Sequence, residues 1–487
     1  FYCIVWVNYF NLFGYNLYCL QKSQSTLCTM DHIPRPNSLP FIGTKLDLIA
    51  AGSGKKLHKY VDNRHKQLGP IFSERLNGNT DLIFLSDPEL IKTLFIKLEG
   101  KYPSHILPDP WILYEKIYGS KRGLFFMNGE EWLQNRRIVN KHLLRDDAEK
   151  WLRPAIVESV EKFIIQLKGK CSKEFQVKDM ESELYKLSIS VIISVLLGKN
   201  TLKNGRHHEE LLQIFAASVK KIFQVTTKLY VWPVNWCQRL NLKVWRDFKE
   251  CVDLSLLLAN KMATEMIKNG DKSDGLINKL VAENIKNEDI IRIIADFIIA
   301  AGDTTAYTTL WILLLLCKNK NVIYDIRSKE DDYVKFVVKE GMRLYPVAPF
   351  LTRILSENTF LGKYEVNKQT PIIASIYTTG RDEQYFSHAQ SFLPHRWDRN
   401  DSRKMNLENH VPAASLPFAM GARSCVGKKI AMIQLIEVIS QIVKNFDIQC
   451  NNKDNINSIT SQVLIPDKCI EFSFTVRNKI DYLKSFK

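Results

Sequence analysis

Residues 416–435 read LPFAMGARSCVGKKIAMIQL, a glycine-rich turn that holds one cysteine, Cys425, and leads directly into an apolar pattern of helical spacing. Gly421 and Gly427 permit a tight turn and the close approach of a flat group to the backbone. The positive end of a helix lowers the pKa of a thiol and favours thiolate. A lone thiolate without a second ligand nearby suits one axial position of a haem iron. The alternative is a buried structural cysteine, the commoner fate of a single thiol.

Composition limits the possible functions. The chain has 487 residues, of which 45% are hydrophobic, and 68 Lys and Arg against 52 Asp and Glu give a net charge of +16. A basic surface favours acidic partners or is simply well solvated. No zinc-finger spacing and no basic tract with interleaved aromatic residues is present, so nucleic acid is not expected as a partner. The ten cysteines are scattered without a C-x-x-C pair, which indicates reduced thiols rather than a disulfide framework.

The N-terminal stretch is uncharged as far as Lys22 and is long enough to span a bilayer, although three asparagines interrupt it. It lacks the arginine-rich, amphipathic character of a mitochondrial transit peptide. Residues 1–30 are therefore interpreted as a targeting, membrane-like or incomplete segment.

Residue patterns predict a mainly α protein with small β-sheets, of the α+β class. GPIFSERLNGNTDLIFLSDPELIKTLF (69–95) indicates a strand, an Asn-Gly turn, a second strand and a helix begun near Asp87 and Pro88. Residues 130–320 have apolar positions three and four apart, which predicts mostly helix. Strand patterns return in 363–377, 461–466 and 469–476. We therefore expect a small β region at each end of the sequence.

The cysteine turn resembles the haem-binding signature of the cytochrome P-450 family, F-x-x-G-x-R-x-C-x-G, at Phe418, Gly421, Arg423, Cys425 and Gly427. The resemblance implies that Cys425 is the proximal iron ligand of haem b and that O₂ is a co-substrate. It also implies a haem buried between a central oxygen-binding helix and the cysteine-ligand loop.

A second motif supports the resemblance. KEGMR places Glu340 and Arg343 three apart on one helix face, and LPHRW supplies Arg396 downstream. An isolated E-x-x-R pair is most often a surface ion pair of little value. In the family, these three residues form a structural lock.

A third motif, ADFIIAAGDTTAYTTLW (295–311), contains the acid–alcohol pair Asp303 and Thr304 after Ala300, Ala301 and Gly302. Small residues let a helix approach a cofactor and leave room for a diatomic ligand, although a helix-packing notch would have the same composition. The resemblance implies that Asp303 and Thr304 deliver protons during catalysis.

The resemblance also assigns haem-propionate contacts to Trp132 and Arg136, at helical spacing in EEWLQNRR, and to Arg353 and Arg423. Motifs from Trp132 to Cys425 must then converge on one cofactor. Residues 31–487 are accordingly predicted to form a single haem-thiolate domain.

Four lysines indicate the electron donor. Lys335 and Lys339 lie four apart, about a quarter turn from the Glu340/Arg343 face, and Lys428 and Lys429 follow the cysteine. A solvated basic face would look the same. The set is similar to the ferredoxin-docking surface of the mitochondrial-type clan, which implies an adrenodoxin-like [2Fe–2S] ferredoxin with its reductase.

The segment VIYDIRSKEDDY (322–333) is shorter than the helical segment that the family usually has at this place. In this respect the chain resembles the arthropod branch of the family, which hydroxylates ecdysteroids at carbon 2. The expected function is hydroxylation of an ecdysteroid precursor, 2-deoxyecdysone, at the matrix side of the mitochondrial inner membrane, with peripheral attachment to the membrane surface. The residues expected to line the steroid pocket are Asp296, Ile299, Ala300, Phe350 and Leu351.

Two alternative functions are compatible with parts of the sequence. A microsomal-type monooxygenase of lipids or xenobiotics, in the endoplasmic reticulum membrane and fed by a flavoprotein reductase, fits the apolar N-terminus. A non-catalytic haem sensor or carrier is disfavoured because it would have no use for Asp303 and Thr304 as a proton relay.

Overall fold

The structure is a computed structural model that describes residues 33–477, apart from 41, 77–79, 171–173, 178, 199–213, 216, 220, 223, 227, 230–232, 270–273 and 330–331. The predicted targeting or membrane-like segment, residues 1–30, lies outside the described residues.

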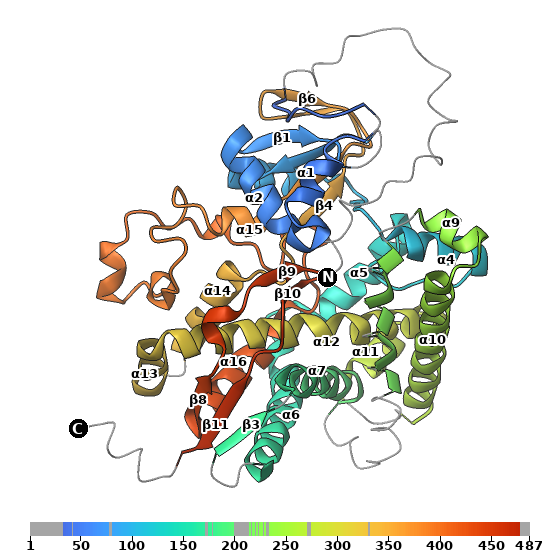
Figure 1. Cartoon of the computed structure of the whole chain (residues 1–487). Coiled ribbons are helices and arrows are strands. Elements are labelled where there is room, and N and C mark those ends of the chain that lie inside the picture. The colour runs from blue at the N-terminus through green and yellow to red at the C-terminus, as the bar shows by residue number, and fades with distance from the viewer. Residues whose placement is uncertain are drawn as a thin grey trace.

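Helices account for most of the described chain, as predicted (Figure 1). Their bounds are α1 Lys45–Ala50, α2 Leu57–Leu68, α3 Pro88–Ile96, α4 Asp109–Tyr118, α5 Gly129–Leu143, α6 Ala148–Lys170, α7 Met180–Leu197, α9 Val234–Arg239, α10 Lys243–Asn269, α11 Leu276–Ala282, α12 Asn287–Lys318, α13 Lys320–Ser328, α14 Tyr333–Leu344, α15 Ile376–Thr379 and α16 Lys428–Asn445.

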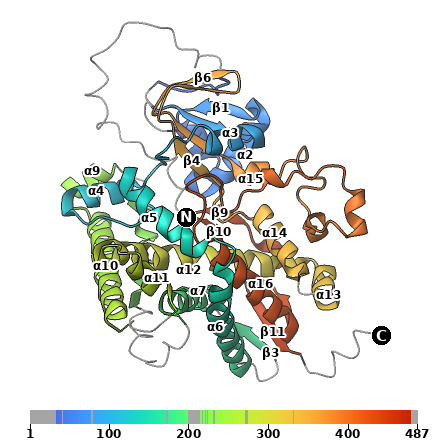
Figure 2. The same ribbon diagram turned by 180° about the vertical axis from the view of Figure 1, so that it is seen from behind.

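The strands are short and form small sheets. Their bounds are β1 Ile71–Glu74, β2 Leu82–Leu85, β3 Glu174–Val177, β4 Leu351–Ile354, β5 Thr359–Leu361, β6 Tyr364–Val366, β7 Pro371–Ala374, β8 Phe446–Cys450, β9 Ser458–Thr460, β10 Leu464–Pro466 and β11 Phe472–Val476. The largest described sheet has the order β1-β2-β7-β4, and a second has the order β3-β11-β8. Both views place the first sheet, with α1 and α2, at the opposite end of the molecule from α6 and α10 (Figures 1 and 2).

The two predicted strands and the helix that follows them are confirmed, whereas the predicted Asn-Gly turn at residues 77–78 lies outside the described residues. β1 and β2 pair antiparallel, with Phe72 opposite Phe84. Asp87 then caps α3, because its carboxylate accepts a hydrogen bond from the Leu90 N–H at 2.8 Å and Pro88 occupies the first helical turn.

The expectation of β structure only near the two ends of the sequence is wrong. β3 lies mid-chain, after α6, and pairs antiparallel with β11, with Val177 opposite Phe472. Its four residues are too short for a clear alternation, and the partner strand that defines it lies almost 300 residues later.

The central helix α12 organises the core. It packs along α7 and also contacts α10, α14 and α16, so that it runs through the middle of the helical layer (Figure 1). Among the described residues, α12 alone is long and apolar enough to cross a bilayer. However, 89% of its most apolar window is buried inside the protein, as in the core helix of a soluble fold.

Candidate active site

The loop before α16 holds Cys425 in a fixed position. The Cys425 N–H donates to the Phe418 carbonyl at 2.8 Å, and α16 begins three residues later, as predicted. Gly421 has a φ of +79°, and a Cβ there would lie 2.2 Å from the Phe95 carbonyl oxygen. A side chain at Gly421 would therefore push the loop away from α3.

The protein environment alone does not favour a thiolate at Cys425, contrary to the sequence-based expectation. Burial raises the pKa of Cys425, whereas a backbone hydrogen bond with Gly427 and the charges of Arg136 and Lys428 act in the opposite direction. The desolvation of the loop outweighs the helix end. A bound metal deprotonates a coordinating thiol outright, so the thiolate form would come with the iron.

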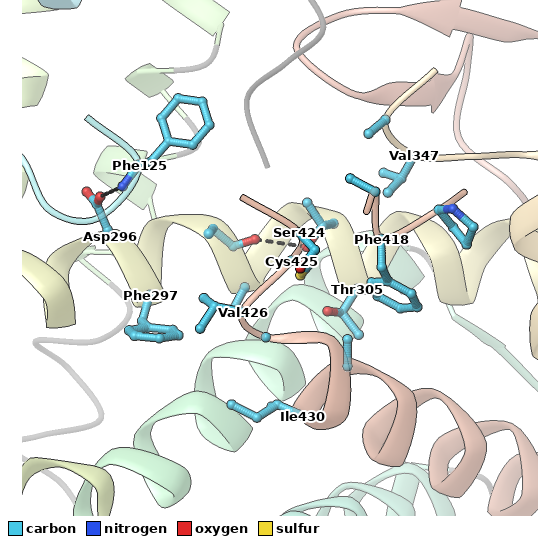
Figure 3. A pocket seen from close by; sticks show the side chains of 18 of the residues that line it. Phe125, Asp296, Phe297, Thr305, Val347, Phe418, Ser424, Cys425, Val426 and Ile430 are labelled. Carbon is cyan, nitrogen blue, oxygen red and sulfur yellow. Dashed lines mark hydrogen bonds between the residues drawn. The ribbon is translucent and has the colours of Figure 1, made fainter. Parts of the chain in front are cut away.

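Cys425 faces a large cavity between its loop and α12. The space between its walls, including the opening to solvent, is about 1640 Å³. Figure 3 shows Cys425 and Phe418 on the loop, with Thr305 of α12 nearby. The predicted residues that line this cavity are Trp132, Arg136, Asp296, Ala300, Thr304, Leu351, Arg353, Phe418, Arg423, Cys425 and Gly427.

Basic side chains gather at one side of the cavity, and several of their nitrogen atoms lack a hydrogen-bond partner. Arg136 Nε, Arg353 Nη2 and both ring nitrogens of His105 are buried without a hydrogen-bond partner. Burial lowers the pKa of Arg136 to about 10 and that of His105 well below its ordinary value. Unpaired buried donors are costly, so this cluster fits a ligand that brings carboxylates. The two propionates of a haem would provide them, and Cys425, which lines the same cavity, would hold its iron.

Arg423 and Trp132 are brought together as predicted, with the guanidinium 4.3 Å above the indole ring. The Arg423 guanidinium donates hydrogen bonds mainly to backbone carbonyls on either side of α4, those of Pro103 and Met127, both at 2.7 Å. These contacts tie the cysteine loop to residues 103–128. A contact of Arg423 with a propionate stays a prediction.

Glu99 joins the cysteine loop to β4. Its carboxylate accepts from Arg353 Nε at 2.9 Å and from the Ala422 N–H at 2.6 Å. Glu99 therefore fixes the position of Arg353 and holds the cysteine loop at Ala422.

The acid–alcohol pair on α12 divides between two environments. Thr304 lines the cavity, and its hydroxyl donates to the Ala300 carbonyl at 2.8 Å. Asp303 is buried but does not line the cavity, because it lies about 100° around the helix from Thr304. Gly302 does not approach the cofactor space either. A Cβ there would lie 2.5 Å from the Tyr185 ring of α7, so Gly302 is the helix-packing notch that was the alternative reading.

Three of the five predicted substrate residues line the cavity, and Ile299 and Phe350 do not. Ile299 packs in the main core because five residues of helix separate it from Thr304 by about 140°. Phe350 is turned into a second cluster with Tyr60 and Phe72, under the β1-β2-β7-β4 sheet. Leu351, the next residue along the chain, faces the cavity instead.

Asp296 is already paired. Its Oδ1 accepts from Arg122 Nη2 at 2.9 Å, and its Oδ2 accepts from the Phe125 N–H at 3.1 Å (Figure 3). The Arg122 guanidinium carbon also lies 4.1 Å from the centre of the Trp111 ring, and Arg292 donates a hydrogen bond to the Arg122 carbonyl. Loop 119–128 is thus anchored to α12 at one end of the cavity. Any steroid hydroxyl bound by Asp296 would share the carboxylate with these groups.

The predicted lock is buried and complete. Glu340 lies 2.7 Å from Arg343 Nη2 and 2.9 Å from Arg396 Nε, and all three side chains are 0% exposed. Burial alone would raise the pKa of Glu340, but Arg343 and Arg396 lower it. The alternative of a surface ion pair is wrong.

The four predicted docking lysines lie near one another on α14 and at the start of α16. The charges of Lys335 and Lys428 both act on Lys339, whose pKa is lowered by burial and by these neighbours. Lys335 pairs at 3.0 Å with the exposed Asp332, whereas Lys429 donates to the Arg145 carbonyl at 2.7 Å. Lys429 is therefore partly engaged by the chain itself.

Sequence reasoning missed Glu99, His105 and Arg122. The first two belong to EGKYPSH (99–105), which has no catalytic spacing, and Arg122 lies in an irregular loop. Only the fold reveals that His105 lines the cavity, that Arg122 pairs with the Asp296 carboxylate and that Glu99 binds Arg353.

Comparisons with known proteins agree with this geometry. The family model described as Cytochrome P450 matches residues 33–474. The chain is 34% identical to "Cytochrome P450 315a1, mitochondrial" of Drosophila melanogaster over 92% of the chain and 89% of that protein. It is 27% identical to the mitochondrial 1,25-dihydroxyvitamin D(3) 24-hydroxylase of Rattus norvegicus, with 91% and 89% covered. It is also 27% identical to the mitochondrial cholesterol side-chain cleavage enzyme of Hypanus americanus, with 85% and 84% covered.

Proposed function

Because this chain belongs to the cytochrome P450 family and is therefore a haem-thiolate monooxygenase, we propose that its substrate is a steroid, most specifically the ecdysteroid precursor 2-deoxyecdysone, hydroxylated at carbon 2. Two similar proteins are named for a secosteroid and a sterol, and both are named as mitochondrial. The resemblance of residues 322–333 to the ecdysteroid branch supports the narrower assignment.

The observation that carries the proposal is the composition of the cavity wall. Beside the cationic cluster, the wall is apolar, with Phe297, Ala300 and Leu351 among its residues. The paired carboxylate of Asp296 lies at one end. A rigid apolar ligand with a hydroxyl at its edge fits such a space.

The haem, when bound, supplies activation of O₂ and insertion of one oxygen atom into a C–H bond. Cys425 would hold its iron, and Arg136, Arg353 and His105 would hold its carboxylates. Thr304 would direct protons into the oxygen-binding space.

We also propose that residues 31–487 act as one domain, since elements from α5 to α16 contribute to the same cavity. The proposed location is the matrix side of the mitochondrial inner membrane, with peripheral membrane contact. The proposed electron donor is a [2Fe–2S] ferredoxin with its reductase, bound at Lys335, Lys339, Lys428 and Lys429. An acidic partner would be steered to these lysines.

Product analysis tests the proposal. Purified enzyme is supplied with ferredoxin and ferredoxin reductase and offered a panel of ecdysteroid precursors that differ at carbons 2, 22 and 25. We expect hydroxylation of 2-deoxyecdysone at carbon 2. Turnover of other lipids but of no ecdysteroid would contradict the substrate. Turnover with microsomal flavoprotein reductase and none with ferredoxin would contradict the donor and the location.

A further inference from the structure

Asp303 is almost fully buried and does not line the cavity, although a proton relay must be resupplied. It is 7% exposed, and it lies on the side of α12 that packs against α7 rather than on the side that lines the cavity. The contact between these two helices therefore offers a route by which protons can reach Asp303 (Figure 1).

Two tyrosines and a glutamate occupy that contact. Asp303 and Tyr307 lie four apart on α12, and Glu181 and Tyr185 lie four apart on α7, so each pair shares one helix face. The Tyr307 hydroxyl donates to Glu181 Oε1 at 2.8 Å. Glu181 lies in the first turn of α7 and is partly exposed to solvent, whereas Tyr307 is buried.

Tyr185 completes the inner end of the cluster. Its hydroxyl oxygen lies 2.9 Å from the position that a Cβ would take at Gly302, the residue before Asp303. That hydroxyl is buried and has no hydrogen-bond partner. A buried hydroxyl without a partner is costly, so its retention beside a catalytic acid points to a use in the reaction.

The charge of Asp303 acts on both hydroxyls. Burial and the Asp303 carboxylate raise the pKa of Tyr185 and of Tyr307 well above the ordinary tyrosine value. Both phenols therefore stay protonated and can accept one proton while donating another.

We propose that Glu181, Tyr307 and Tyr185 form the path by which solvent protons reach Asp303. Protonated Glu181 gives its proton to the Tyr307 oxygen while Tyr307 releases its own towards Asp303, and Tyr185, whose hydroxyl has no partner in this structure, turns to donate to the receiving carboxylate. Glu181 then takes a new proton from water. One proton enters and one is delivered, so no group in the path changes its charge over a cycle. This inference rests on the proposed monooxygenase role of Asp303 and Thr304.

The test compares Glu181→Gln and Tyr307→Phe with the wild type, with saturating steroid and ferredoxin. The measured quantities are product and peroxide per electron consumed and the solvent deuterium isotope effect. We expect each variant to raise the peroxide fraction at least threefold and to enlarge the isotope effect. Haem content and steroid dissociation constant should stay within twofold of wild type. Glu181→Asp should restore coupling, because it keeps a transferable proton.

Tyr60→Phe is the matched control, because Tyr60 also donates to a buried carboxylate, that of Glu74, in the separate cluster under the first sheet. It should leave the peroxide fraction unchanged. If Glu181→Gln and Tyr307→Phe both kept the peroxide fraction and the isotope effect of the wild type, the proposed path would be overturned. This result can be read with any steroid that the enzyme hydroxylates, so it does not depend on the ecdysteroid assignment. The double variant Asp303→Asn/Tyr307→Phe should be no less coupled than Asp303→Asn alone, because the residues act in series. Additive losses would also overturn the path.

Discussion

Replacement of Glu340 by alanine should destabilise the protein more than any single surface change. In the structure, the Glu340 carboxylate accepts from Arg343, from Arg396, from Trp397 Nε1 at 2.8 Å and from the Leu393 N–H at 3.0 Å. Removal of the carboxylate leaves two guanidinium groups that are 0% exposed without their anion. Loss of one partner of a buried ion pair costs about 3–5 kcal/mol.

The carbonyls around the arginines limit the loss. Arg343 also donates to Gly380 and Ala389, and Arg396 also donates to Ser387. These bonds would survive in the variant, so the loss should lie near the lower end, about 3 kcal/mol, which is roughly a hundredfold change in the unfolding equilibrium.

The assay is urea denaturation of the haem-loaded protein, followed by tryptophan fluorescence and by haem absorbance. Glu158→Ala is the matched control, because Glu158 and Lys162 form an exposed pair on α6, worth about 0.3–0.5 kcal/mol. We expect the urea midpoint of Glu340→Ala to lie far below that of Glu158→Ala, and we expect Glu340→Ala to bind little haem. A variant with full haem content and a midpoint equal to that of Glu158→Ala would refute the account of the lock.

Three further predictions concern catalysis. Thr304→Ala should keep haem and steroid binding but divert electrons to peroxide; an unchanged yield of product per electron would show that Thr304 does not guide protons. Leu351→Ala should change the steroid dissociation constant or the position of hydroxylation, whereas Phe350→Ala should cost about 3–5 kcal/mol of stability with little effect on either; the reverse pattern, in spectral titration and unfolding, would contradict the cavity wall described above. Reversal of Lys335 and Lys339 to glutamate should raise the ferredoxin concentration for half-maximal rate, more strongly at low salt, without altering steroid affinity; equal saturation curves for variant and wild type would place the donor elsewhere.

The sequence predicted the elements whose patterns are local. The helical spacing around residues 130–320 and the cap at Asp87 follow from neighbouring residues, and both are present among the described residues. The predicted Asn-Gly turn lies outside the described residues. β3 was missed because a four-residue edge strand is specified by its partner β11, not by its own sequence.

The candidate site divides in the same way. Spaced motifs predicted Cys425 and Glu340 because a turn or helix fixes the spacing that chemistry requires. The sequence does not show which side of a buried helix faces the cavity, because all sides of such a helix are apolar. For this reason Ile299 was assigned to the cavity in error. Glu99 and His105 could not be predicted at all, since their partners come from chain segments that only the fold brings together.

The carbon monoxide difference spectrum of reduced, haem-loaded protein tests the central claim, that Cys425 is the thiolate ligand in the cavity wall, most directly. Wild type and Cys425→Ser are compared with Cys450→Ser, which changes a cysteine of β8 that does not line the cavity. The account predicts the thiolate-type band near the violet–blue border for wild type and Cys450→Ser, and its loss in Cys425→Ser. A normal thiolate-type band in Cys425→Ser would contradict the assignment of the ligand.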